Sequence, residues 1–159
     1  MQFSNRERDL LINHLEGGQA FISMDKVLEN VPFSKLGKRP SGLPYSFYQI
    51  FWHMVYAQKD ILEYTVSEIY KDRNWPDDYW PKQTGPESLE EWEHLKKDYF
   101  KDQKELKDVI NNSEIDLSTS VLNSERHSYF REILLIIEHN SYHTGQLVIL
   151  GRLLNEYSS

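Results

Sequence analysis

Two histidines near the C-terminal end, His139 and His143, are the residues of this sequence best suited to chemistry. They lie in the segment IEHNSYHTGQLVILGRLL. In an α-helix, residues four positions apart differ by about 40° around the axis and share one face. Leucine and isoleucine residues of the segment project to this face, so we expect both imidazoles in the interior. Two explanations fit such a pair: buried histidines bonded to core polar groups, or metal ligands.

A third histidine, His53, favours the metal. It lies in SFYQIFWHMVYAQKDILEY, on a helical face shared with Ile50, Ala57 and Ile61. Two facing helices can then offer three imidazoles to one point, the usual construction of a metal site inside a helical bundle. Three neutral imidazoles suit Zn, Ni, Fe, Co or Cu and leave coordination positions open for water or substrate. The remaining histidines, expected to be exposed or locally bonded, are His14, His94 and His127.

Other polar residues near these histidines define the chemistry further. A zincin protease carries H-E-x-x-H, whose glutamate acts as the base. Here Asn140 follows His139, and because an amide cannot take up the proton, that mechanism is not supported. Asp60, seven residues beyond His53 on the same face, is the candidate catalytic base or hydrogen-bond partner of a ligand, although a helical aspartate is more often a solvated charge. Gln146 is a candidate to hydrogen-bond a histidine or a ligand, or else packs the helix interface.

Helices separated by segments rich in proline and glycine are expected to position these side chains. Three capping signatures predict helix starts: Ser4 with Glu7, Ser46 with Gln49, and Ser88 with Glu91. The predicted helices reach Leu28, about Tyr70 and about Asn112, and the last spans about Glu125 to Glu156. Because no alternating strand pattern occurs, the sequence predicts an all-α four-helix bundle in a single domain, residues 1–159.

The segments between the predicted helices are long for a bundle, in which connections usually have about 2–8 residues. Each is long enough to travel the height of a bundle, so a crossover can join parallel neighbours. Gly17 and Gly18, inside the first predicted helix, indicate a tolerated kink or a close approach by another backbone, and we favour the second. An aromatic loop can wall a ligand pocket, cap the bundle end, or do both, and we favour the cap: Trp75, Pro76, Tyr79, Trp80 and Pro81.

Composition limits the possible partners. Acidic residues outnumber lysine and arginine by 25 to 18, and the resulting net charge of −7 argues against nucleic acid. The lack of cysteine excludes disulfides, thiolate ligands and a cysteine nucleophile. The N-terminus has no apolar signal segment, and no apolar run approaches the roughly 20 residues of a membrane span. We therefore expect a cytoplasmic protein with a small-molecule substrate and no nucleic-acid or membrane partner.

Three segments together resemble the DinB/YfiT-like superfamily: EHNSYHTGQLVILGRLL, GKRPSGLPYSFYQIFWHMVYAQKDILEY and WPDDYWP. The resemblance extends over essentially the whole chain from LEGGQAF onward. It implies a four-helix bundle of up-down-down-up type, a divalent metal on three histidines, and frequent homodimers. By position, the family's ligands fall on His53, His139 and His143. One stretch departs from the family pattern, because LNSERHSYF stands where related sequences have a glycine-rich entry into the last helix.

The resemblance also implies the kind of chemistry. Relatives include metal-dependent transferases and isomerases that use low-molecular-weight thiols, and one member is regarded as a hydrolase. We expect a divalent transition metal (Zn, Ni or Fe) to activate a thiol or water, which makes the protein a thiol transferase or hydrolase. The alternatives are a bundle that binds metal as a sensor or structural brace, and a metal-free bundle with buried polar histidines. A strip of small residues on the last helix predicts a homodimer: Ser141, Thr144, Gly145, Val148 and Gly151.

Overall fold

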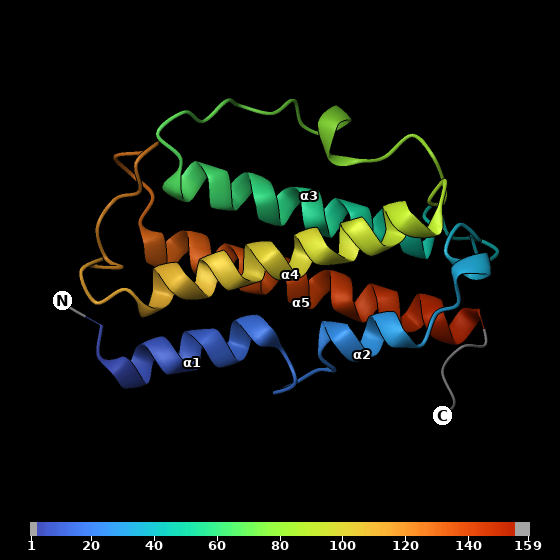
Figure 1. Cartoon of the computed structure of the whole chain (residues 1–159), viewed down its shortest axis with the longest axis horizontal. Coiled ribbons are helices and arrows are strands. Elements are labelled where there is room, and N and C mark those ends of the chain that lie inside the picture. Colours follow the sequence, from blue (N-terminus) through green and yellow to red (C-terminus); the bar gives the residue numbers. More distant parts are fainter. Residues whose placement is uncertain (1–2, 155–159) are drawn as a thin grey trace.

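The chain folds into a bundle of α-helices that run side by side (Figure 1). The computed structural model describes residues 3–154. Its α-helices are α1 (Asn5–Glu16), α2 (Met24–Glu29), α3 (Phe47–Val66), α4 (Leu89–Asn111) and α5 (Tyr129–Leu153), with short 3₁₀ helices η1 (Phe33–Lys35) and η2 (Asp77–Tyr79). Helices α1 and α2 run in one direction, α3 and α4 run back, and α5 returns (Figure 1). The predicted all-α, up-down-down-up bundle is confirmed.

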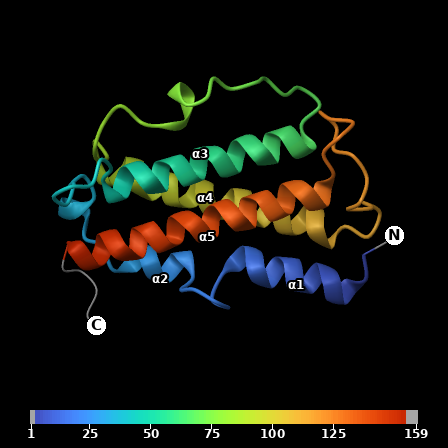
Figure 2. The same cartoon turned by 180° about the vertical axis from the view of Figure 1, so that it is seen from behind.

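The first predicted helix is two helices, because the chain turns at Gly17 and Gly18. Both have positive φ angles, 77° and 79°, a conformation that residues with a Cβ rarely adopt. A Cβ added at Gly18 would meet no atom within 4 Å. The atoms nearest to a Cβ at Gly17 belong to Phe21, at 3.0 Å, and to Ser23, at 3.5 Å, a few residues along the same turn. The expected close approach of a separate stretch of backbone is therefore wrong, and these glycines serve the turn. Beyond it, α2 continues in the direction of α1 (Figure 2).

Serine side chains start the helices where the capping signatures predict. Ser4 and Ser46 form capping boxes with Glu7 and Gln49, and the Ser88 hydroxyl accepts a hydrogen bond from the backbone of Glu91. The other predicted boundaries shift by a few residues. Helix α3 ends at Val66 instead of about Tyr70, and α5 begins at Tyr129, after the Ser128 cap, instead of at Glu125. The predicted end of the last helix, Glu156, lies outside the described residues.

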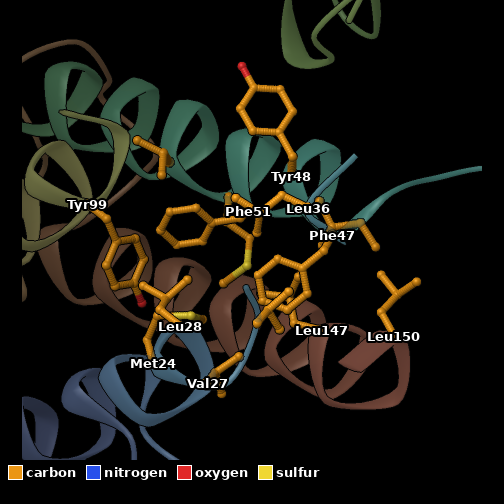
Figure 3. Close-up of a cluster of buried hydrophobic side chains, with 14 of the residues drawn as sticks. Met24, Val27, Leu28, Leu36, Phe47, Tyr48, Phe51, Tyr99, Leu147 and Leu150 are labelled. Atoms are coloured by element: carbon orange, nitrogen blue, oxygen red, sulfur yellow. The ribbon is translucent and has the colours of Figure 1, made fainter. Parts of the chain in front are cut away.

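The interior contains two apolar clusters, one toward each end of the bundle. The cluster in Figure 3 joins α2, the first half of α3, α4 and the end of α5, and includes Val27, Phe47, Phe51, Tyr99 and Leu147. The other joins α1 to the opposite ends of α3, α4 and α5. Because α3 and α5 contribute to both clusters, they are held together along their lengths. Within residues 3–154, no helix has the length and apolarity that crossing a membrane requires.

Residues 67–88 connect two parallel helices, α3 and α4, and therefore travel the length of the bundle alongside α3 (Figures 1 and 2). This confirms the expected crossover. Its far end is pinned to the segment before α3, because the Ser46 hydroxyl donates to the Thr84 carbonyl. There is no space between the two segments: a Cβ on Gly85 would lie 2.9 Å from the Cα of Gly37. The crossover is thereby held beside the helix that carries His53.

Candidate metal centre

Three histidine side chains from two helices meet between α3 and α5. His53 comes from α3, and His139 and His143 come from successive turns of α5. The Nε2 atoms of His53 and His139 are 3.1 Å apart, and one nitrogen from each of the three rings lies within 4.8 Å of the other two. His53 and His143 are buried and His139 is half-buried. The structure therefore brings together all three predicted ligands, the single such group found within residues 3–154.

Hydrogen bonds to Nδ1 of His53 and His143 leave the other ring nitrogen, Nε2, without a proton. The carbonyl of Tyr79 lies 2.9 Å from Nδ1 of His53, and the side-chain oxygen of Gln146 lies 2.6 Å from Nδ1 of His143. Both oxygens can only accept, so each Nδ1 carries the proton and each Nε2 has a lone pair, which in His53 faces Nε2 of His139 at 3.1 Å. Second hydrogen bonds of this kind are what orient metal-binding histidines.

Burial keeps the three imidazoles neutral. Loss of solvent lowers the pKa of His53. The same effect, with smaller contributions from His143 and His53, lowers the pKa of His139 to about 3. Burial also lowers the pKa of His143 to about 4 against the opposing hydrogen bond of Gln146. Since only a neutral imidazole binds a metal, the rings are ready to do so at pH 7.

These features fit a divalent transition metal. Nitrogens bound to one zinc ion at about 2.0–2.1 Å lie roughly 3.3 Å apart, which is close to the separation between His53 and His139. All three donors are neutral nitrogens, the ligand type that Zn, Ni and Fe share. Three protein ligands also leave at least one coordination position for water or substrate.

The triad forms part of the wall of a cavity of about 590 Å³, a volume within the usual range of small-molecule sites. Trp75, Tyr79 and Trp80 of the crossover form another part of the wall. The Trp80 ring stacks on that of His53, with centroids 4.2 Å apart and planes 5° from parallel. The expectation that this aromatic loop caps an end of the bundle is wrong. Because α3 and α4 are parallel, the loop runs alongside α3 and walls the pocket.

Asp60 lines the same cavity and is 8% exposed. The hydroxyls of Tyr70 and Tyr79 donate to its two oxygens, at 3.1 Å for Tyr70, and Nε of Arg73 lies 3.4 Å from one of them. Both carboxylate oxygens thus have protein partners. Its predicted role as a base stays a prediction, and the geometry offers another role: Tyr79 connects Asp60 to His53.

The remaining histidines lie apart from the triad, as expected. His94 is exposed beside Asp98, and His14 is exposed on α1. Nδ1 of His127 lies 3.1 Å from the hydroxyl of Tyr64.

The small-residue strip on α5 is mostly covered by the chain itself. Thr144 and Gly151 are buried, Ser141 and Val148 are half-buried, and Gly145 alone of the five is exposed. The homodimer stays a prediction, but most of this strip is already covered within one chain and is not available to a second copy.

Two residues of the cavity wall were not predicted from the sequence. Tyr45 stacks on Trp80, with centroids 4.4 Å apart. It precedes the cap of α3 in an irregular segment, so no periodicity could place it. Tyr142 is 64% exposed and packs against His143, with centroids 4.9 Å apart. Its position between the two α5 histidines was the only available clue.

The protein is thus an all-α bundle with a three-histidine group that could bind a metal beside an open cavity. Comparison with protein families matches the DinB superfamily over residues 22–147, and the chain belongs to this superfamily. The matched range includes His53, His139 and His143. Comparisons with curated proteins and with solved structures gave no match.

Proposed function

We propose that this protein is a metal-dependent enzyme that holds a divalent transition metal on His53, His139 and His143. A metal bound there lowers the pKa of a bound water or thiol so that it can attack a substrate at neutral pH. The reaction is then a hydrolysis or a thiol transfer on a small molecule.

The observation that carries this proposal is that the triad opens into a cavity. A structural metal is normally enclosed by four protein ligands, whereas a catalytic metal keeps a position open. Here three histidines converge, and beside them lies a space of about 590 Å³. The cavity is large enough for a substrate to reach the side of the triad that no protein ligand occupies.

The surrounding residues have positioning roles in this proposal. Tyr79 and Gln146 hold His53 and His143 through their Nδ1 atoms and leave both Nε2 atoms unprotonated, the state that binds a metal. Gln146 is itself held, because its amide nitrogen donates to the Tyr142 hydroxyl at 3.2 Å. Trp80, stacked on His53, excludes water from one face of the ring. These contacts hold the rings in place before metal arrives, which reduces the entropy lost on binding.

The first test is the metal content of tag-free protein, measured by mass spectrometry and compared between the wild type and His143→Ala. We expect about one equivalent of a transition metal in the wild type and a large loss in the variant, because two ligands bind more weakly than three. His94→Ala is the matched control: it removes an exposed histidine of α4 and should leave the metal content unchanged.

Reaction tests follow on the metal-loaded protein, with thiol-transfer, esterase and amidase substrates. Turnover that disappears in His143→Ala and persists in His94→Ala would support an enzyme. If neither the isolated nor the Zn-, Ni- or Fe(II)-reconstituted wild type holds metal, the proposal fails. Metal that cannot be exchanged, together with a collapse of thermal stability on chelation, would instead indicate a structural brace.

A further inference from the structure

The cavity beside the triad is walled mainly by aromatic rings. Tyr45, Trp80 and His53 form a continuous stack, with neighbouring centroids 4.4 and 4.2 Å apart. Tyr79 and Trp75 continue the wall along the crossover, with ring centroids 5.0 Å apart and planes inclined by 64°. Most of these rings are fixed by ring contacts or hydrogen bonds, so they present a preformed apolar surface.

Two of the rings at this cavity remain largely exposed. Trp75 is 69% exposed on the crossover, and Tyr142 is 64% exposed on α5. Trp75 belongs to the crossover and lies near His53, whereas Tyr142 belongs to α5 and packs against His143. Exposed large aromatics gathered at one cavity are typical of ligand contacts. A flat apolar group placed between them would bury surface that the folded chain leaves in water.

A second apolar hollow borders the first. Its volume is about 340 Å³, and it shares Tyr45 and Gln146 with the main cavity. Its other walls are aliphatic, from Leu43, Ile50 and Ile149 among others. An apolar ligand longer than a single ring therefore has a surface of matching character to continue along.

Charge at the cavity selects against acids. Among the described residues, neither lysine nor arginine lines it. Its one carboxylate, Asp60, is bound by two tyrosine hydroxyls and faces Arg73, so it has little capacity left to hold a cationic ligand. The chain as a whole carries a net charge of −7. A carboxylated or phosphorylated ligand would leave water without gaining a cationic partner for its charge, which is costly.

We propose that the cavity binds an uncharged molecule with a flat apolar group and selects against carboxylated or phosphorylated molecules, acidic thiols included. The class of substrate rests on the proposed function, because it assumes that this cavity is where the reaction occurs. Trp75 and Tyr142 are the residues that determine the preference. They contact the apolar group, whereas the histidines face the reacting end.

Calorimetric titration with two probes of the same shape tests this proposal: naphthalene-2-carboxamide, which is uncharged, and naphthalene-2-carboxylate. We expect the metal-free protein to bind the amide at least about ten-fold more tightly, because the cavity offers no cationic partner for a buried negative charge. Metal-free protein decides the question, since a carboxylate could bind to the metal itself. Trp75→Ala and Tyr142→Ala should each weaken amide binding by roughly five-fold, and their exposure makes both substitutions compatible with folding.

Phe100→Ala is the matched control, because Phe100 is an aromatic residue, 41% exposed on α4, that does not line the cavity. Equal or tighter binding of the carboxylate by metal-free protein would overturn the proposal, as would amide binding that Trp75→Ala leaves unchanged. Tightest binding of 2-naphthylmethylammonium would overturn it in favour of a cation–π cage. Failure of the proposed function has a different signature, the absence of metal from reconstituted protein, and leaves the ranking of the probes unaffected.

Discussion

Tyr79 is bound to α3 at two points. Its carbonyl accepts a hydrogen bond from His53, and its hydroxyl donates to Asp60. These two α3 residues are about two helical turns apart, so Tyr79 lies along the helix and fixes the crossover on it. Asp60 thus acts on the triad through Tyr79, and its charge holds the residue that orients His53.

Asp60→Asn should therefore weaken metal binding. The amide keeps the size of the carboxylate, but its nitrogen cannot accept a hydrogen bond from a tyrosine hydroxyl. We expect the metal dissociation constant to rise roughly ten-fold, as is typical when a partner of a ligating histidine is lost. A competition titration against a chromophoric chelator measures it. Tyr70→Phe, which removes the other hydroxyl and spares Tyr79, should have a smaller effect.

The opposite pattern would indicate that Asp60 takes part in the reaction itself. If Asp60→Asn retained metal with unchanged affinity but lost turnover, the carboxylate would be acting as the predicted base. The two roles therefore separate in one pair of measurements.

Asp102 on α4 is another buried acid, and it does not line the cavity beside the triad. It is 6% exposed, and its Oδ2 has no hydrogen-bond partner. Burial raises its pKa to about 6, with Lys59 and Lys101 opposing the rise and Asp98 and Glu105 adding to it. The folded state thus takes up a proton between about pH 6 and pH 4 that the unfolded state does not. Ionisation of Asp102 therefore lowers the free energy of unfolding as the pH rises from about 4 through 6, and the protein is more stable below this range.

Asp102→Asn should raise the free energy of unfolding at pH 8, on the order of 1 kcal/mol, because it removes a poorly satisfied buried charge. It should also flatten the dependence of stability on pH between 4 and 7. Urea unfolding across this range measures both effects. The control is Asp108→Asn, an exposed aspartate on the same helix that does not affect the pKa of Asp102. An unchanged pH profile in Asp102→Asn would contradict the assignment.

At the scale of elements, two helices and one crossover build the site. Helix α5 presents His139 and His143 on one face by its own periodicity, and α3 presents His53 opposite them. The crossover contributes the aromatic wall, and its position depends on the contact between Gly37 and Gly85. Small residues there let two irregular segments touch at backbone distance.

Gly85→Ala should destabilise the protein by roughly 1–3 kcal/mol, because the added Cβ would meet backbone 2.9 Å away and one segment must move. The matched control is Gly145→Ala on α5, where an added Cβ meets no atom within 4 Å. That change should stabilise the helix by roughly 0.5–1 kcal/mol. Thermal unfolding of both variants tests the pair. A neutral effect at Gly85 would show that the crossover is not pinned at this point.

At the scale of the whole molecule, the DinB superfamily assignment and the up-down-down-up order agree. This order makes α3 and α4 parallel and so requires a connection that runs the length of the bundle. A bundle with short turns would have no such segment to wall the site. The topology of the fold therefore supplies the cavity beside the three histidines.

The oligomeric state is a prediction at this scale. We expect light scattering at micromolar concentration to give twice the 19.0 kDa mass of one chain, in line with the homodimers that the family resemblance implies. Since most of the predicted strip on α5 is covered, the contact surface would have to include other exposed residues. A mass of one chain at that concentration would show that the homodimer prediction is wrong.

The sequence by itself determined most of the helix starts and the three histidines that share the interior of the bundle. Helix starts depend on caps within a few residues, as at Ser4 and Ser46, and the shared face of His139 and His143 follows from helical periodicity. Both are local properties, so they can be predicted without knowing where the helices lie. His53 was predicted with them because it also lies on the apolar face of a helix.

Only the tertiary structure decided what surrounds those histidines. Tyr45 and Trp80 lie in two irregular segments, whose sequences have no helical periodicity from which the positions of these side chains could be predicted. The tertiary structure also decided the surroundings of Asp60, whose partners come from the crossover, and of the small residues of α5, most of which the folded chain covers. Local rules establish which side chains share a helix face, whereas contacts between segments distant in sequence establish which of them meet at the site.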